Sequence, residues 1–204
     1  MIHRPIILAF AFCVLPAAAN AQLSVEMRNI RCEQYLAMSP SQSSAFSAWM
    51  SGWYSYKIGK TGVDLIAYQK NIVNVKAWCK YHPQDTVMSA WISRQPGNKA
   101  LEQRRIVMTR NVVIILAIFF STALLPAAAQ VNLDMNQITC KDLLGYDSVN
   151  QDFVKYWMSG YYSASKNNDV LDFRRLQRNT EKVMAYCKKN KSDPLPKAIN
   201  KSAT

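Results

Sequence analysis

Four cysteines are the residues of this chain whose type and spacing could carry chemistry. Cys32 and Cys79 lie 47 residues apart, and so do Cys140 and Cys187. Such pairs could form structural disulfides, bind a metal ion or act as a redox couple. No Cys-x-x-Cys motif is present, which argues against oxidoreductase work, and two lone thiols are a poor zinc site because structural zinc takes four ligands. We therefore predict one structural disulfide for each pair, Cys32–Cys79 and Cys140–Cys187.

Histidine chemistry has little support in this sequence. The chain has two His, at positions 3 and 82, and the residue equivalent to His82 in the second half is Asn190. A lone His before a proline is typical of a surface turn. There is no Ser-His-Asp arrangement, no His/Cys ligand cluster and no glycine-rich phosphate loop. The sequence predicts no enzyme, no metal site and no cofactor.

Two export signals explain why the cysteines should be oxidised. Residues 1–21 have a positively charged N-terminal region, an apolar stretch and an Ala-x-Ala cleavage site. A second segment of the same design runs from Met108 to Ala129. It could instead be a true membrane helix. Once the first domain is exported, however, Arg104, Arg105 and Arg110 would lie on the outer side of the membrane, against the preference for positive charges on the cytoplasmic side.

The signals divide the chain into four parts. We predict a signal peptide (1–21), a first domain (22–103), a linker with an internal signal-like apolar helix (104–129) and a second domain (130–204). The chain is either two adjacent genes read as one or a true fusion whose internal signal is also cut. Without that signal no stable membrane anchor remains, and both domains reach the periplasm of a Gram-negative bacterium.

The two domains repeat each other at a fixed offset, at which Cys32 corresponds to Cys140 and Cys79 to Cys187. Trp-Met-Ser-Gly occurs at 49–52 and again at 157–160, and 15 of the 49 positions from 32 to 80 are identical in the second copy without a gap. Each copy is small for an independent core. A disulfide that closes a loop of this length contributes about 4 kcal/mol in the chain-entropy treatment.

Apolar periodicity predicts an all-α fold with about four short helices in each domain. The spacing i, i+3, i+4, i+7, i+8 marks one helix face per domain. Ser43 or Ser44 is the expected N-cap of the first such helix and Asn150 that of the second. The faces consist of Phe46, Trp49, Met50, Trp53 and Tyr54, and of Val154, Trp157, Met158, Tyr161 and Tyr162.

Three further segments complete the prediction for each domain. A short helix opens at the first Cys, and a longer one ends near the second. A last short helix is expected from about 84 to 92. Its counterpart, 192–204, is rich in Pro and Lys and is predicted to fray. No strand pattern is recognisable.

Taken together, these features resemble the HdeA/HdeB family of small all-helical periplasmic acid-stress chaperones. They are the export signal, the early Cys, the amphipathic helix, the second Cys 47 residues later, and an Asp that precedes this second Cys at the same spacing in both copies. The resemblance covers both domains. It implies an ATP-independent chaperone that is folded at neutral pH, as a homodimer or as a heterodimer of the two units. In acid it would expose apolar helix faces and hold acid-denatured periplasmic proteins in solution.

The resemblance also implies which residues respond to pH. Asp64 and Asp172 match an acidic position of the family's pH response, although an acid there also suits a helix N-terminus. A second such position, two residues after the first Cys, is Asp142 in the second unit and Gln34 in the first. The first unit is also poorer in acids, with five against eight. The switch is therefore expected mainly in the second unit.

The aromatic helix faces have two interpretations. They are either plain core or a dimer and client surface that acid exposes. The candidates for that surface are Phe46, Trp49, Trp53, Tyr54, Trp157, Tyr161 and Tyr162.

Charge raises two other possibilities. The net charge of +12 could suit nucleic acid, but the basic residues are spread along the chain and the signals direct export, so no nucleic-acid partner is predicted. The alternative function is a constitutive cationic periplasmic binding or inhibitor module with no pH switch.

Overall fold

The computed structural model describes residues 24–95 and 132–202. The two predicted signal segments, 1–21 and 108–129, lie outside these residues. Each domain has four α-helices in its described part, as the periodicity predicts. The first contains β1 (Ser24–Glu26), a 3-10 turn (Met27–Asn29), α1 (Cys32–Ala37), α2 (Pro40–Lys57), β2 (Gly62–Asp64), α3 (Leu65–Cys79) and α4 (Val87–Arg94). The second contains β3 (Asn132–Asp134), α6 (Cys140–Gly145), α7 (Ser148–Ser165), β4 (Val170–Asp172), α8 (Phe173–Lys189) and α9 (Leu195–Ser202).

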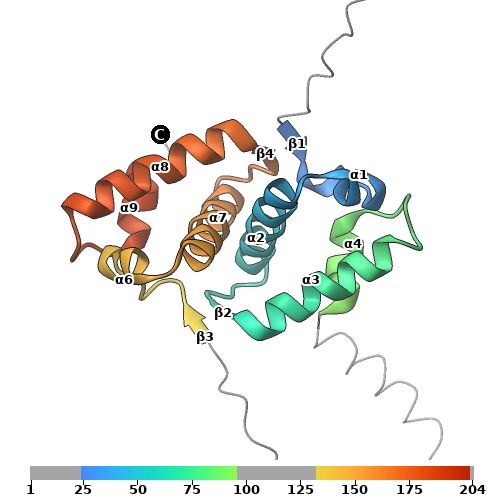
Figure 1. The fold of residues 1–204 in the computed structure, drawn as a ribbon, viewed down its shortest axis with the longest axis horizontal. Coiled ribbons are helices and arrows are strands. Elements are labelled where there is room, and N and C mark those ends of the chain that lie inside the picture. Colours follow the sequence, from blue (N-terminus) through green and yellow to red (C-terminus); the bar gives the residue numbers. More distant parts are fainter. Residues whose placement is uncertain (1–23, 96–131, 203–204) are drawn as a thin grey trace, which may run out of the picture.

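The two domains pack together through their central helices. In Figure 1, α2 and α7 lie side by side in the middle of the molecule, with α1, α3 and α4 on one side and α6, α8 and α9 on the other. One hydrophobic core runs through both domains. Within the described residues, no helix is both long enough and apolar enough to cross a membrane.

Helices α2 and α7 start earlier than predicted. Ser39, not Ser43 or Ser44, is the N-cap of α2, and its Oγ accepts a hydrogen bond from the Gln42 backbone N–H at 3.3 Å. Asp147, not Asn150, is the N-cap of α7. The predicted caps were wrong because they were placed next to the aromatic face. Pro40 extends α2 by one turn, since a proline fits the first helical position.

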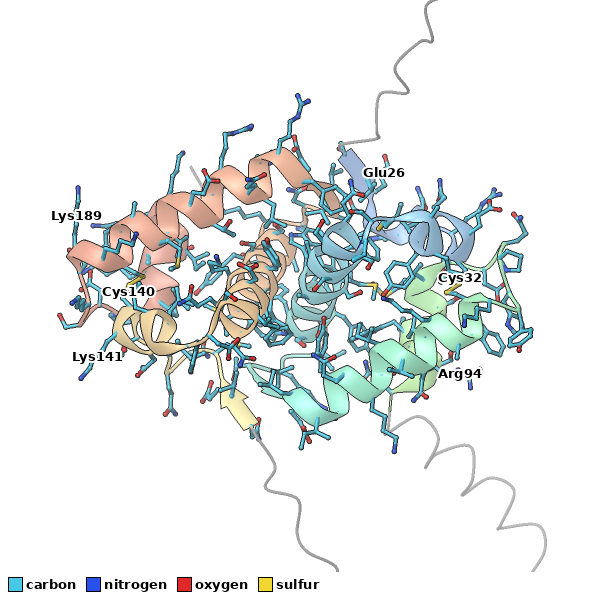
Figure 2. All side chains as sticks on the ribbon, viewed as in Figure 1. Glu26, Cys32, Arg94, Cys140, Lys141 and Lys189 are labelled. Atoms are coloured by element: carbon cyan, nitrogen blue, oxygen red, sulfur yellow. A yellow bond between two sulfur atoms is a disulfide. The ribbon has the colours of Figure 1, made fainter. Side chains whose placement is uncertain are left out.

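Both predicted disulfides are present. Cys32 opens α1 and Cys79 ends α3, so their bond ties the short first helix to the end of the long one. Cys140 in α6 and Cys187 in α8 repeat this arrangement. All four side chains are fully buried, and Figure 2 labels the first cysteine of each pair, Cys32 and Cys140.

Over its described residues, 192–202, the C-terminal segment does not fray, contrary to the prediction. Residues 195–202 form α9, in which Leu195, Ala198 and Ile199 are buried against α7 and α8. Their i, i+3, i+4 spacing is that of an amphipathic helix, and Pro196 is tolerated because it lies in the first turn. The composition of this segment hid the periodicity.

Four short strands were also not predicted. β1 pairs antiparallel with β4, with Val25 opposite Leu171, and β2 pairs antiparallel with β3, with Val63 opposite Leu133. Each strand has three residues and finds its partner in the other domain. A pattern within one domain therefore carries no signal for them.

Candidate functional site: the seam between the two domains

The candidate site is the contact region between the domains, which we call the seam. It comprises α2 against α7 and the strand pairs β1–β4 and β2–β3. At its centre the two helices cross at a pair of equivalent glycines. A Cβ added to Gly52 would lie 1.9 Å from the Trp157 carbonyl oxygen, and one added to Gly160 would lie 1.9 Å from the Trp49 carbonyl oxygen. The helix backbones therefore touch directly.

These glycines are seam residues that the sequence analysis missed. Gly in a helix interior is less favourable than Ala by about 1 kcal/mol, yet it occurs at the same position of both copies. The signal was present in the repeated Trp-Met-Ser-Gly sequence. Only a hydrogen fits at the crossing, which explains why Gly is found there.

The predicted aromatic surface lies along the seam and the adjoining core. Phe46, Trp49 and Trp157 are at most 2% exposed. Trp53 is 7% exposed, and its indole N–H donates to the Asn168 carbonyl oxygen across the seam at 3.1 Å. The aromatic face of α2 is therefore covered on one side by its own domain and on the other by the second domain.

The tyrosines of the predicted surface are partly buried. Tyr161 stacks on Trp157 with ring centroids 5.2 Å apart and meets Tyr56 edge to face across the seam at the same distance. Tyr54 and Tyr162 occupy equivalent positions and are half-buried. The structure thus brings the seven predicted residues together around α2 and α7.

Polar contacts close both ends of the seam. The Arg28 guanidinium lies 3.0 Å from the Asp169 carboxylate. The Met27 backbone N–H donates to the Asp169 carbonyl oxygen, and the Met135 N–H donates to the Thr61 carbonyl oxygen, at 2.9 and 3.0 Å. The last two bonds are equivalent by the repeat, so the seam has an approximate twofold symmetry.

Asp64 and Asp172 connect the seam to the long helices. Each is the last residue of a seam strand and the N-cap of the helix that follows. Asp64 Oδ1 accepts from the Ile66 and Ala67 backbone N–H groups at 2.9 and 3.0 Å. Asp172 Oδ1 accepts from the Arg175 N–H at 2.9 Å. Both carboxylates therefore stabilise a helix start directly beside the partner domain.

Asp142 lies away from the seam, in the capping box of α6. Its Oδ2 accepts from the Thr139 hydroxyl at 2.7 Å and from the Thr139 N–H at 2.9 Å. These hydrogen bonds lower the pKa of the Asp142 carboxyl below its usual value. In the first domain, Gln34 accepts the corresponding bond from the Arg31 N–H at 2.9 Å. An amide cannot titrate, so only the second domain has an acid-sensitive box at this position.

Two further acids with lowered pKa were not predicted. Asp147 caps α7, and hydrogen bonds from the backbone and side chain of Asn150 lower the pKa of its carboxyl. At Asp193 the Tyr186 hydroxyl donates to the carboxylate and the Lys197 ammonium lies beside it, and both lower its pKa. An Asp three residues before an Asn at a helix start was the signal available for Asp147. All resolved downward carboxyl shifts among the described residues belong to the second domain.

Each domain also has a pocket beside its central helix. The pockets measure about 400 Å³ in the first domain and about 230 Å³ in the second. No His lines either pocket. His82 lies in the turn after α3, and the centroid of its ring is 3.3 Å from that of the Trp78 ring. Five positions of the repeat carry the same residue and line both pockets. They are Ser51, Tyr54, Ser55, Asp64 and Asn71 in the first domain and Ser159, Tyr162, Ser163, Asp172 and Asn179 in the second.

The described residues contain no cluster of metal ligands. Among them, no three His, Cys, Asp or Glu side chains gather where they could hold a metal ion. What the seam does in this structure is bury a large aromatic surface, which includes Trp49, Trp53 and Trp157.

A family model matches the chain twice, over residues 5–89 and 109–197, and its description is the HdeA/HdeB family. Each match begins inside one of the signal-like segments and extends past the second Cys of its domain. Neither the comparison with curated proteins nor that with solved structures gave a match. The family is known for acid-stress chaperones of the periplasm. With both halves matched, the chain belongs to the HdeA/HdeB family and holds two copies of it.

Proposed function

We propose that this protein is an ATP-independent, acid-activated periplasmic chaperone. The observation that carries the proposal is the seam, where each domain covers the aromatic helix face of the other. At neutral pH the packed pair is the resting state, and its apolar surface is unavailable. In acid the domains separate, and the exposed faces of α2 and α7 hold unfolding proteins in solution. No catalytic step or cofactor takes part.

The acid response is a linkage effect. The carboxyls of Asp142, Asp147 and Asp193 have a lower pKa in the folded protein than in the unfolded chain. Their stabilising contribution is complete above the unfolded pKa of about 4 and is lost as the pH falls through the folded values. Because these groups hold the starts of α6 and α7 and the turn before α9, acid loosens the second domain around its seam helix.

Acid also acts on the seam through the overall charge. The seam already holds an ion pair between the domains, with the Arg28 guanidinium 3.0 Å from the Asp169 carboxylate. The Lys and Arg side chains remain charged, so both domains become more positive and repel each other. Repulsion between cationic complexes would also keep bound clients in solution. The disulfides keep each opened domain from unfolding completely.

A client-aggregation assay tests this function. A periplasmic enzyme that unfolds in acid is brought to about pH 3 with and without the protein, and light scattering is followed. We expect suppression of scattering in acid and none at pH 7 with a heat-unfolded client. Equal protection at both pH values would contradict the switch and favour the alternative, a constitutive cationic binding module. No protection at either pH would contradict the chaperone function itself.

Export is the second part of the proposal. The two signal-like segments direct both domains to the periplasm, where cleavage after Ala21 and after Ala129 yields two disulfide-stapled proteins. The intact unreduced mass of the periplasmic product is the test. We expect two species, starting at Gln22 and Gln130, each two hydrogens lighter than the reduced chain. One species that still contains residues 108–129 would contradict cleavage and support an anchored two-domain protein.

A further inference from the structure

We propose that the two domains are matched to each other, so that a mixed pair forms in preference to two copies of the same domain. This inference deepens the proposed function, because it names the partner that covers the client surface. It rests on the seam contacts that break the symmetry of the repeat.

The centre of the seam would permit any combination. Gly52 and Gly160 are equivalent residues, and each admits the backbone of the opposite helix. The bonds from Met27 and Met135 are equivalent main-chain contacts. A pair of first domains or a pair of second domains could use the same crossing. Selectivity must therefore come from the side chains around it.

The ion pair at the edge of the seam exists in one direction only. Arg28 contacts Asp169 at 3.0 Å, whereas the equivalent residues on the other edge are Asn136 and Thr61. In a pair of first domains, each Arg28 would face a Thr61. In a pair of second domains, each Asp169 would face an Asn136. Only the mixed pair brings the two charges together.

An aromatic contact across the seam is also directional. Tyr56 meets Tyr161 with centroids 5.2 Å apart, and the equivalent positions on the other side are Ala164 and Trp53. In the mixed pair, one side of the seam therefore has two aromatic rings in contact. On the other side, the small Ala164 lies opposite the large Trp53. Two first domains would place Tyr56 against Trp53 twice, and two second domains would place Ala164 against Tyr161 twice. The first arrangement overfills the seam and the second underfills it.

Two more contacts follow the same rule. The Tyr68 and Phe153 rings lie 4.7 Å apart across the seam, where the equivalent residues are Leu176 and Ala45. The Lys57 ammonium lies 3.2 Å from the Asn167 side-chain oxygen. On the other side of the seam, the residue equivalent to Lys57 is Ser165, and the residue equivalent to Asn167 is Gly59. All four side-chain contacts join residues that only the mixed pair brings together. Encoding both domains in one chain supplies them in equal amounts.

The test uses the full chain with a specific protease site inserted on each side of residues 104–129. After cleavage the domains are separated in guanidinium with the disulfides intact, returned to pH 7 without denaturant, and counted by native mass spectrometry. Guanidinium replaces acid so that the result does not depend on the pH switch. The two domains differ in mass, so the three possible dimers are resolved.

If the domains pair at random, half of all dimers contain one domain of each kind. We expect more than about four-fifths, which corresponds to a roughly fourfold preference for each mixed pair. A random distribution, an excess of same-domain pairs, or monomers alone would overturn the proposal. These outcomes are independent of the client assay, so a failed chaperone function and a failed pairing preference are distinguishable.

Matched variants identify the residues responsible. Asp169→Thr and Tyr56→Ala give each position the residue type of its counterpart in the other domain, and together they should return the mixed share towards half. Lys197→Ser is the control. It also introduces the counterpart residue and breaks an exposed ion pair, but that pair lies at the start of α9 in one domain, outside the seam. It should leave the mixed share unchanged. Unchanged pairing in the double variant would show that these contacts do not select the partner.

Discussion

Substitution of Gly52 by alanine is the most direct perturbation of the seam. The added Cβ would lie 1.9 Å from the Trp157 carbonyl oxygen and 2.7 Å from its carbonyl carbon. Ordinary van der Waals contact begins at 3.4 Å. The obstructing atoms are backbone in the middle of α7 and cannot rotate away. The two helices must therefore move apart until the new methyl group and the carbonyl oxygen reach that separation.

The substitution has opposite effects on the pair and on the isolated domain. Overpacking a close contact costs about 1–3 kcal/mol, and we expect about 3 kcal/mol here because backbone meets backbone. That cost weakens pairing about 150-fold. Within α2 itself, replacing Gly by Ala gains about 1 kcal/mol of helix stability. The first domain should therefore remain folded while the seam opens.

Hydrogen exchange and client protection at pH 7 measure the two effects. We expect faster exchange in α2 and α7, unchanged protection around the disulfides, and suppression of client aggregation at neutral pH, where the proposed function requires the parent protein to be inactive. Gly145→Ala is the matched control. Gly145 ends α6 with no atom near the position of an added Cβ, so its substitution should leave the seam closed. Native exchange in α2 and α7 of Gly52→Ala would refute the assignment of the crossing as the tight contact.

Two other predictions follow from the same structure. Replacing Gln34 by Glu places in the first domain the acid that Asp142 supplies in the second. It should steepen the fall in the free energy of unfolding between about pH 5 and pH 2, whereas Asp142→Asn should flatten it, as denaturant titrations at several pH values would measure. Removing the first disulfide with Cys32→Ser and Cys79→Ser should cost about 4 kcal/mol, seen as a lower denaturation midpoint than that of the parent protein. Equal slopes in the first experiment, or an unchanged midpoint in the second, would contradict the stated causes.

The sequence was sufficient for the features that depend on local pattern. Helix faces follow from the 3.6-residue period, and the two disulfides follow from paired cysteines behind an export signal. The N-caps of α2 and α7 were misplaced because an aromatic face marks the buried part of a helix and not its first turn. Ser39 before Pro40 was the better signal for the start of α2.

The features that join the domains could not be read from either domain alone. The pairing of β1 with β4 joins segments from different domains, with Val25 opposite Leu171. Three-residue strands also carry too little alternation to be recognised. The seam glycines were visible only as repeated residues. Their role depends on the backbone of the opposite helix, which no pattern within α2 describes. The same reason hides the contacts of Arg28 and Tyr56.

If the proposed chaperone function holds, the placement of the two aspartate caps lets one sensor serve both proposed client-binding faces. Asp142 and Asp147 hold the starts of α6 and α7 in the second domain, and the equivalent residues in the first are the neutral Gln34 and Ser39. The first domain therefore lacks these two titrating groups. It has no need of them, because its aromatic face is covered by α7. Under the proposed switch, acid that loosens α7 also uncovers the face of α2, and the first domain can remain folded while this happens. An acid-poor copy can thus be released by an acid-rich one, provided that the two are paired with each other.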